Sequence, residues 1–172
     1  WIDADADGIQ DTTEAPVAGV TVELLSDTGT VIRGTVTDSN GFYSFDDLTP
    51  SVGYQIRFGE VEGHVRTFQD QGSSNSVDSD ADRTTGIATF TAAASGVNSL
   101  VTPDDPTIDA GYFAPVRVGN YVWIDTNADG IQDATDVPVE DVTLNLSGVD
   151  GAGNTVTGTT TTNSGFLAGL AL

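Results

Sequence analysis

The sequence predicts an all-β protein built as an antiparallel β-sandwich. Apolar side chains alternate with polar ones over short stretches, as at Val20, Val22 and Leu24, and this period of two is typical of half-buried strands. Turns rich in Gly, Asn and Asp separate these stretches, and apolar residues at the helical spacing of three and four are nearly absent. Short strands joined by such turns, without helices between them, favour two packed antiparallel sheets.

Clear turn signals set off the first strands. The alternating stretch 20–24 is followed by a turn at Asp27-Thr28-Gly29, and a second stretch ends at Asn40-Gly41, which is a strong signal for a tight hairpin turn. The full expected set of strands is 20–24, 31–37, 42–45, 54–58, 64–68, 87–91 and 107–113. The aromatic residues at strand spacing are expected to fill the core: Phe42, Tyr43, Phe45, Tyr54, Phe58 and Phe68.

A tandem repeat divides the chain. Alignment of Trp1 with Trp123 brings matching residues together well into the strand that follows. We therefore expect a first unit over 1–114, whose opening strand is missing, and a second, incomplete repeat over 115–172. The joint between the units is short and contains Pro115, which favours a stiff connection.

An acidic loop of twelve residues follows the tryptophan in both units. Its oxygen-bearing side chains stand at loop positions 1, 3, 5, 9 and 12, with Gly at position 6, which is the ligand spacing of a calcium loop. Position 7 ligates through its backbone carbonyl, so an isoleucine is acceptable there. The predicted Ca²⁺ ligands are Asp3, Asp5, Asp7, Ile9, Asp11 and Glu14 in the first loop, and Asp125, Asn127, Asp129, Ile131, Asp133 and Asp136 in the second.

Electrostatics favours a bound cation in these loops. Two carboxylates 4 Å apart repel by about 4 kcal/mol at an effective dielectric constant near 20, and a divalent ion turns this repulsion into an attraction that orders the loop. The alternative is that Asp, Asn and Gly simply form turns, but the full ligand pattern recurs with the same flanking residues. Asp136 stands where a bidentate Glu is usual, so weaker or more magnesium-tolerant binding is expected in the second loop.

The charge balance restricts the partners. The formal net charge is −21, there is no Cys, and all five basic residues are Arg. Nucleic acids and anionic membranes bind basic patches, so neither is expected as a partner, and no stretch is apolar enough to span a membrane. The acidity favours cations and a location outside the cell, where calcium is plentiful. Because there are no disulfides, bound calcium is expected to stabilise the fold.

Five segments follow one another along the chain, namely Trp1–Asp11, Pro16–Leu24, Thr37–Phe45, Asp78–Gly86 and Ile108–Phe113. In their residues and their order, these segments resemble the B repeat of serine–aspartate-repeat surface adhesins. The resemblance covers the first unit almost end to end and part of the second. It implies an immunoglobulin-like or prealbumin-like sandwich, head-to-tail stacking of repeats, calcium-dependent rigidity and exposure on the cell surface.

The same resemblance adds a second candidate cation site in the first unit. Asp78, Asp80 and Asp82 alternate along an otherwise irregular stretch, and Asp109 is expected to join them from the last strand. The alternative is a solvated acidic loop that holds no ordered ion.

The leading hypothesis is a structural one, in which the chain is a calcium-rigidified spacer or stalk of an extracellular surface or filament protein. Subunits could also assemble head to tail by strand exchange, with residues 116–122 or the apolar tail 167–172 completing a neighbour. The alternatives are a ligand-binding adhesin module and a non-catalytic spacer of a secreted enzyme. Catalysis is not expected, because the chain has one His, no Cys and no nucleophile motif.

Overall fold

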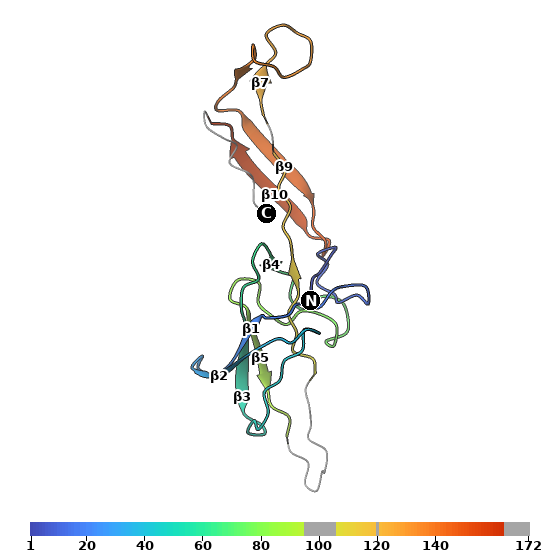
Figure 1. The fold of residues 1–172 in the computed structure, drawn as a ribbon, viewed down its shortest axis with the longest axis vertical. Coiled ribbons are helices and arrows are strands. Elements are labelled where there is room, and N and C mark those ends of the chain that lie inside the picture. Colours follow the sequence, from blue (N-terminus) through green and yellow to red (C-terminus); the bar gives the residue numbers. More distant parts are fainter. Residues whose placement is uncertain (95–105, 120, 164–172) are drawn as a thin grey trace. The chain divides into compact units, whose positions relative to one another are not determined.

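The structure is a computed structural model that describes residues 1–94, 106–119 and 121–163. It divides into two compact units, Trp1–Ala114 and Pro115–Leu172 (Figure 1). Every regular element of the described residues is a strand, and none of these residues forms a helix that could cross a membrane. The prediction of an all-β, antiparallel fold is confirmed. The apolar tail 167–172, which was predicted to complete a neighbour, lies outside the described residues.

A four-stranded antiparallel sheet forms the body of the first unit. Its strands are β1 (Thr21–Ser26), β2 (Val31–Val36), β3 (Gly53–Phe58) and β5 (Ile87–Thr91), in the order β2-β1-β3-β5 (Figure 1). Strands β1 and β3 are central and carry the buried side chains, whereas β2 lies at an edge and is largely exposed. This division explains why alternation is clearest in β1, since only one face of that strand contacts the core.

Strand β1 places more apolar side chains in the core than strict alternation allows. Val22 and Leu24 point to the same face and are almost fully buried, as the period of two predicts. Leu25 is also buried, although it lies outside the main hydrophobic cluster, and the register against β2 shifts between Leu24 and Leu25. Such an irregularity turns a strand locally and re-aims its next side chain. Ile56 and Phe58 of β3 complete this part of the core.

A second, smaller layer closes the core of the first unit. Strand β4 (Val65–Arg66) pairs with β6 (Tyr112–Phe113) in an antiparallel sheet. Tyr112 is almost fully buried in the same hydrophobic cluster as β1 and β3, and its hydroxyl donates a hydrogen bond to the carbonyl of Gly59. The first unit therefore forms the sandwich that alternation and turn chemistry predicted.

Some strand and core predictions are wrong or too long. Residues 42–45 form no strand, because the Asp38 carboxylate accepts hydrogen bonds from the N–H groups of Asn40 and Phe42 and holds the chain in a turn. Phe42 is 72% exposed and does not belong to the core. The predicted strands 64–68 and 107–113 shorten to β4 and β6.

Four of the five remaining aromatic residues contact the core as predicted, whereas Phe68 is not part of the hydrophobic cluster. Phe58 is buried in the core, and Tyr43, Phe45 and Tyr54 pack against it from its rim. Tyr43 meets Phe58 edge to face, with 5.5 Å between ring centroids. Phe68 is half-buried and has the guanidinium of Arg83 over its ring, 4.7 Å from the centroid.

The described residues of the second unit form two two-stranded sheets. Strand β7 (Trp123–Ile124) pairs with β8 (Val137–Pro138), and β9 (Thr143–Val149) pairs with β10 (Thr155–Thr161) (Figure 1). Most of its described side chains are exposed, including Leu144 of β9. The described residues of this unit therefore form no core like that of the first.

One hydrogen-bonded threonine shows that the two units share local structure. In the first unit, the Thr37 hydroxyl accepts the N–H of Val20 and donates to the carbonyl of Val17. In the second unit, Thr162 makes the corresponding bonds to the N–H of Val142 and the carbonyl of Val139. The sequence repeat is therefore also a repeat of side-chain geometry.

Gly111 is expected to be intolerant of any side chain. A Cβ atom there would lie 2.7 Å from Cγ2 of Thr67 and 2.8 Å from the indole ring of Trp1. Overpacking of this kind costs about 1–3 kcal/mol, so Gly111→Ala should lower the melting temperature measured by circular dichroism. Gly148→Ala is the matched control, because a Cβ there has no atom within 4 Å and should leave the melting temperature nearly unchanged. Equal melting temperatures for the two variants would contradict this packing.

Candidate metal centre

The first acidic loop is anchored to the core by Asp3. This carboxylate is 1% exposed and accepts hydrogen bonds from the backbone N–H groups of Asp7, at 3.2 Å, and Gly8, at 2.9 Å. It also accepts a short hydrogen bond from the Thr67 hydroxyl. A buried carboxylate needs such partners, because an unpaired charge away from water is costly. Asp3 therefore fixes both the path of the loop and its attachment to the sandwich.

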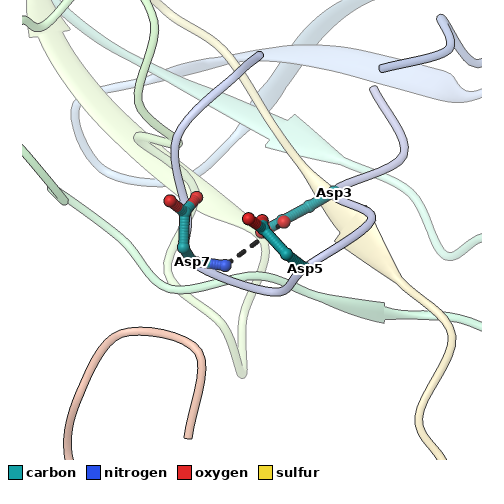
Figure 2. A group of neighbouring side chains, drawn as sticks. All are labelled: Asp3, Asp5 and Asp7. Carbon is teal, nitrogen blue, oxygen red and sulfur yellow. Dashed lines mark hydrogen bonds between the residues drawn. The ribbon is translucent and has the colours of Figure 1, made fainter. Parts of the chain in front are cut away.

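Three carboxylates converge at the mouth of this loop. One oxygen each of Asp3, Asp5 and Asp7 lies within 4.8 Å of the other two (Figure 2). Asp5 is exposed and Asp7 is half-buried, so the group opens towards solvent on one side. Hard oxygen ligands at this spacing suit Ca²⁺, which accepts six to eight of them in flexible geometry. Of the described residues, only these three form such a group.

The other predicted ligands of the first loop have backbone partners that shape it. Glu14 accepts hydrogen bonds from the N–H groups of Ala4, at 2.6 Å, and Asp11, at 3.0 Å, so it closes the loop across its two ends. Ile9 donates its N–H to Asp7 and forms an isolated bridge with Asp78. The side chain of Asp11 is exposed. Direct ligation by Ile9, Asp11 and Glu14 stays a prediction.

Gly8 is required in the first loop for two physical reasons. Its φ angle is +84°, in the left-handed region that side chains rarely adopt. A Cβ atom would also lie 2.6 Å from the Gln71 side chain and 2.7 Å from the carbonyl of Phe68. Ala6 has a φ angle of 59°, so the loop also holds a non-glycine residue in this region.

The second loop repeats the hydrogen bonds of the first. Asp125 accepts the N–H groups of Asp129 and Gly130 at 3.2 Å and 2.8 Å, as Asp3 does in the first loop. Asp136 accepts the N–H groups of Thr126 and Asp133, each at 3.0 Å. The shorter side chain of Asp136 therefore closes its loop in the manner of the glutamate in the first.

The surroundings of the second loop differ. Gly130 has no atom within 4 Å of a notional Cβ, and Ile131 is 65% exposed. The Asn127 amide donates to Asp129 at 2.9 Å and, more weakly, to Asp133 at 3.4 Å. This neutral donor already joins two carboxylates, so a cation has less repulsion to relieve there than beside Asp5 of the first loop.

The second predicted site of the first unit brings three of its four residues together. Asp80 accepts the N–H of Asp109 at 2.7 Å and donates its own N–H to the Asp109 carbonyl at 3.0 Å. Asp78 is 5% exposed, and its Oδ1 atom has no hydrogen-bond partner. Such an orphaned oxygen fits a cation ligand. The oxygens of these three side chains do not all lie within the 4.8 Å that unites the first group.

Burial shifts the titration of this second group. It raises the pKa of Asp80 to about 7 and the pKa of Asp109 to about 6, and the nearby charge of Asp78 raises both. Without a cation, these carboxyls therefore hold protons well above the usual range of an aspartate. A divalent ion would supply the missing positive charge.

Asp82 has a different role from its neighbours in the sequence. Its Oδ1 atom accepts hydrogen bonds from the N–H groups of Thr84 and Thr85 and from the Thr85 hydroxyl. The hydrogen bonds from Thr85 lower the pKa of Asp82. This is the geometry of an aspartate that caps a turn, and direct ligation by Asp82 stays a prediction.

Sequence spacing missed two residues that shape these sites. Thr67 binds Asp3 from a distant part of the chain, and Asp70 is close enough to raise the pKa of Asp80. Both lie outside any ligand motif. Thr67 could have been anticipated only from chemistry, because a buried carboxylate requires a hydroxyl or amide donor.

Comparison with known proteins gives a consistent family match. Residues 1–112 and 116–168 match the SdrD B-like domain. The chain is 39% identical over 165 residues to serine-aspartate repeat-containing protein F of Staphylococcus epidermidis. This alignment covers 95% of this chain and 9% of that protein. It is 36% identical over 153 residues to serine-aspartate repeat-containing protein D of Staphylococcus aureus strain Newman, covering 88% of this chain and 11% of that protein. The chain thus spans about a tenth of these curated relatives.

The raised pKa values predict that stability falls with pH when calcium is absent. Asp80 and Asp109 bind protons more tightly in the folded protein than at their ordinary value of 3.8. Their contribution is therefore complete below about pH 4 and is lost as the pH rises through about 6 to 7. In calcium-free buffer, the melting temperature should fall over this range, and Asp80→Asn should flatten the fall.

Asp82→Asn is the matched control for this pH dependence. The pKa of Asp82 is lowered, so its contribution is lost at low pH and the substitution leaves the fall between about pH 4 and 7 in place. Melting curves by differential scanning fluorimetry, followed across this range, measure both effects. Identical slopes for Asp80→Asn and the unaltered chain would refute the assignment.

Proposed function

This chain belongs to the SdrD B-like domain family, and on that premise we propose that it is a calcium-stabilised structural repeat, acting as a rigid spacer in an extracellular protein. The serine-aspartate repeat-containing relatives are cell-surface proteins, and the chain has an extracellular, surface location in common with them. The family relation also supports a non-catalytic role.

One observation carries the calcium proposal. The carboxylates of Asp3, Asp5 and Asp7 converge on a loop whose anchor, Asp3, is buried and fully hydrogen-bonded (Figure 2). Uncompensated carboxylates at this distance repel, so the loop favours a cation that neutralises them. We propose Ca²⁺ at this site, a second Ca²⁺ beside Asp78, Asp80 and Asp109, and a weaker one in the second unit's loop.

A bound ion in the first loop would stiffen the path through the first unit. The loop begins at Asp3, whose N–H donates to the carbonyl of Tyr112 on β6, while the N–H of Tyr112 donates to the carbonyl of Trp1. Ordering the loop therefore also orders the segment that joins it to the last strand of the unit. Rigidity of this segment is what a spacer needs.

The two compact units support a tandem arrangement. We propose that Trp1–Ala114 is one repeat and that the second unit, which follows it in the chain after the joint at Pro115, is a further repeat of the same kind. The shared hydrogen bonds of Thr37 and Thr162 support this assignment. The activity and partners of any longer protein that contains these repeats are part of the same proposal.

Calcium removal tests the stabilising role directly. An ion present at a hundred times its Kd stabilises the folded form by about 2.7 kcal/mol, which corresponds to a rise of roughly 10 °C or more in melting temperature for a unit of this size. Chelation with EDTA should lower the melting temperature by this order, and calcium add-back should restore it. An unchanged melting temperature would defeat the proposal.

Single substitutions separate the two loops. Asp7→Ala should abolish most of the calcium-dependent stabilisation of the first unit, whereas Asp129→Ala should affect only the second. Both aspartates accept the same kind of backbone hydrogen bond, at 2.8 Å, so the loss of that bond is matched. Asp27→Ala removes an exposed carboxylate outside the loops and serves as the control. Isothermal titration calorimetry with CaCl₂ measures the number of sites lost, and equal loss in all three variants would contradict the assignment.

A further inference from the structure

The chain offers only five bonds to an enzyme that cuts after a basic residue. Enzymes of the trypsin class select such bonds, because a carboxylate in their specificity pocket binds the cationic side chain. There is no Lys in the sequence, so the candidate bonds are those that follow Arg33, Arg57, Arg66, Arg83 and Arg117. The surroundings of each arginine decide which of these bonds the enzyme can reach.

The two arginines of the main sheet are held by partners. The Arg33 guanidinium of β2 donates to the carbonyl of Asp46 and lies 5.9 Å from the ring centroid of Phe45. Arg57 of β3 forms an ion pair with Glu23 of β1. The backbone of both arginines is also paired within the sheet. Neither can therefore enter the cleft of a protease unless the sheet first opens.

The other two arginines of the first unit are held as well. Arg66 is 5% exposed and donates hydrogen bonds to a backbone carbonyl and to Glu60. The guanidinium of Arg83 is half-buried and lies 4.7 Å from the ring centroid of Phe68 and 5.2 Å from that of Phe113. Aromatic rings attract a cation placed over their faces, so releasing Arg83 would disrupt contacts of the last strand, β6.

Arg117 differs from these four arginines. It is exposed, and among the described residues it has no hydrogen-bond or ion-pair partner. Its neighbours Val116 and Val118 are 86% and 67% exposed, and the stretch 115–119 makes no backbone hydrogen bond to the described residues. A protease binds its substrate as an added extended strand, so free backbone groups are what it requires.

The charge of the same stretch also suits this class of enzyme. The chain has a net charge of −21, yet residues 115–119 contain no acid and one Arg. A specificity pocket that ends in a carboxylate therefore meets an attractive charge here and no acidic residue beside it. Exposed chain of this kind, between compact units, is where proteolytic cleavage concentrates.

We propose that the Arg117–Val118 peptide bond is a processing site for serine proteases of the trypsin class, and that its cleavage separates the two units while the first stays folded. The enzyme's serine forms an ester with the carbonyl carbon of Arg117, the C–N bond breaks, and the nitrogen of Val118 leaves as an amine with the serine's proton. Water then hydrolyses the ester, so Arg117 ends in a carboxyl group and the two fragments together gain one water molecule. The first unit, Trp1–Ala114, keeps strands β1 to β6.

Limited digestion of the full chain with trypsin, in buffer that contains calcium, tests the site. Intact-mass spectrometry should find 1–117 and 118–172 as the first products. Arg117→Gln should slow the loss of intact chain by at least about tenfold, because the other arginines are reached only when the first unit opens. Arg117→Lys should restore cleavage, since the pocket binds either cation. A first cut after any other arginine would overturn the proposal.

Two further variants show whether the bond itself is recognised. Val118→Pro keeps Arg117 but places a ring on the nitrogen that must leave, so it should resist trypsin as strongly as Arg117→Gln. Arg33→Gln is the matched control, because it removes an exposed arginine whose side chain is held, and it should leave the rate of the first cut unchanged. Cleavage of Val118→Pro at the rate of the unaltered chain, or slow cleavage of Arg33→Gln, would contradict the site.

The products and their response to EDTA complete the test. The purified fragment 1–117 should give the same melting transition by circular dichroism as the first unit of the uncut chain, and an unfolded fragment would overturn the release of a folded unit. EDTA should speed the later cuts within the first unit and leave the first cut unchanged. Later cuts that ignore EDTA would count against the calcium proposal and leave the processing site standing. No cut after Arg117, with later cuts still sensitive to EDTA, would do the reverse.

Discussion

The buried carboxylate of Asp3 is the interaction on which the rest of the first unit depends. It receives two backbone N–H groups of its own loop and the hydroxyl of Thr67, so a single side chain joins the loop to the sandwich. Because its own hydrogen bonds are satisfied, the Asp3 side chain can be buried, and it lies beside Asp5 and Asp7. The cluster of carboxylates is thus a consequence of the hydrogen bonds that attach the loop to the sandwich through Asp3.

The same loop sequence behaves differently in different surroundings. Both loops have the same backbone hydrogen bonds, and the left-handed residues Ala6 and Ala128 have φ angles of 59° and 60°. Within the part of the chain that the structure describes, only the first loop packs against another segment, where Ile9 bridges to Asp78 and Gly8 lies against Phe68. The twelve-residue motif therefore determines the backbone geometry of the loop. The rest of the repeat determines how deeply the loop is buried, and with it how strongly the loop carboxylates interact.

Local patterns predicted the fold class, β1, β3 and β5, and the spacing of the loop aspartates, because alternation and turn chemistry act over a few residues. They did not predict that Phe42 would leave the core, since the turn held by Asp38 decides this. They also gave no sign that the carboxylate of Asp82 accepts hydrogen bonds from Thr85 in a turn, whereas that of Asp80 accepts one from Asp109. Contacts such as Thr67 with Asp3 join distant parts of the chain and leave no periodic signal.

The pairing of the first residues with the last strand has a mechanical consequence. Ile2 and Tyr112 form a parallel bridge, and hydrogen bonds from Asp3 to Tyr112 and from Tyr112 to Trp1 lie on either side of it. When the two ends of the first unit are pulled apart, parallel neighbours slide along each other, so these bonds are loaded in shear and must break together. An antiparallel pair pulled at one end would instead unzip one bond at a time. This topology makes the first unit resistant to a force that pulls its two ends apart.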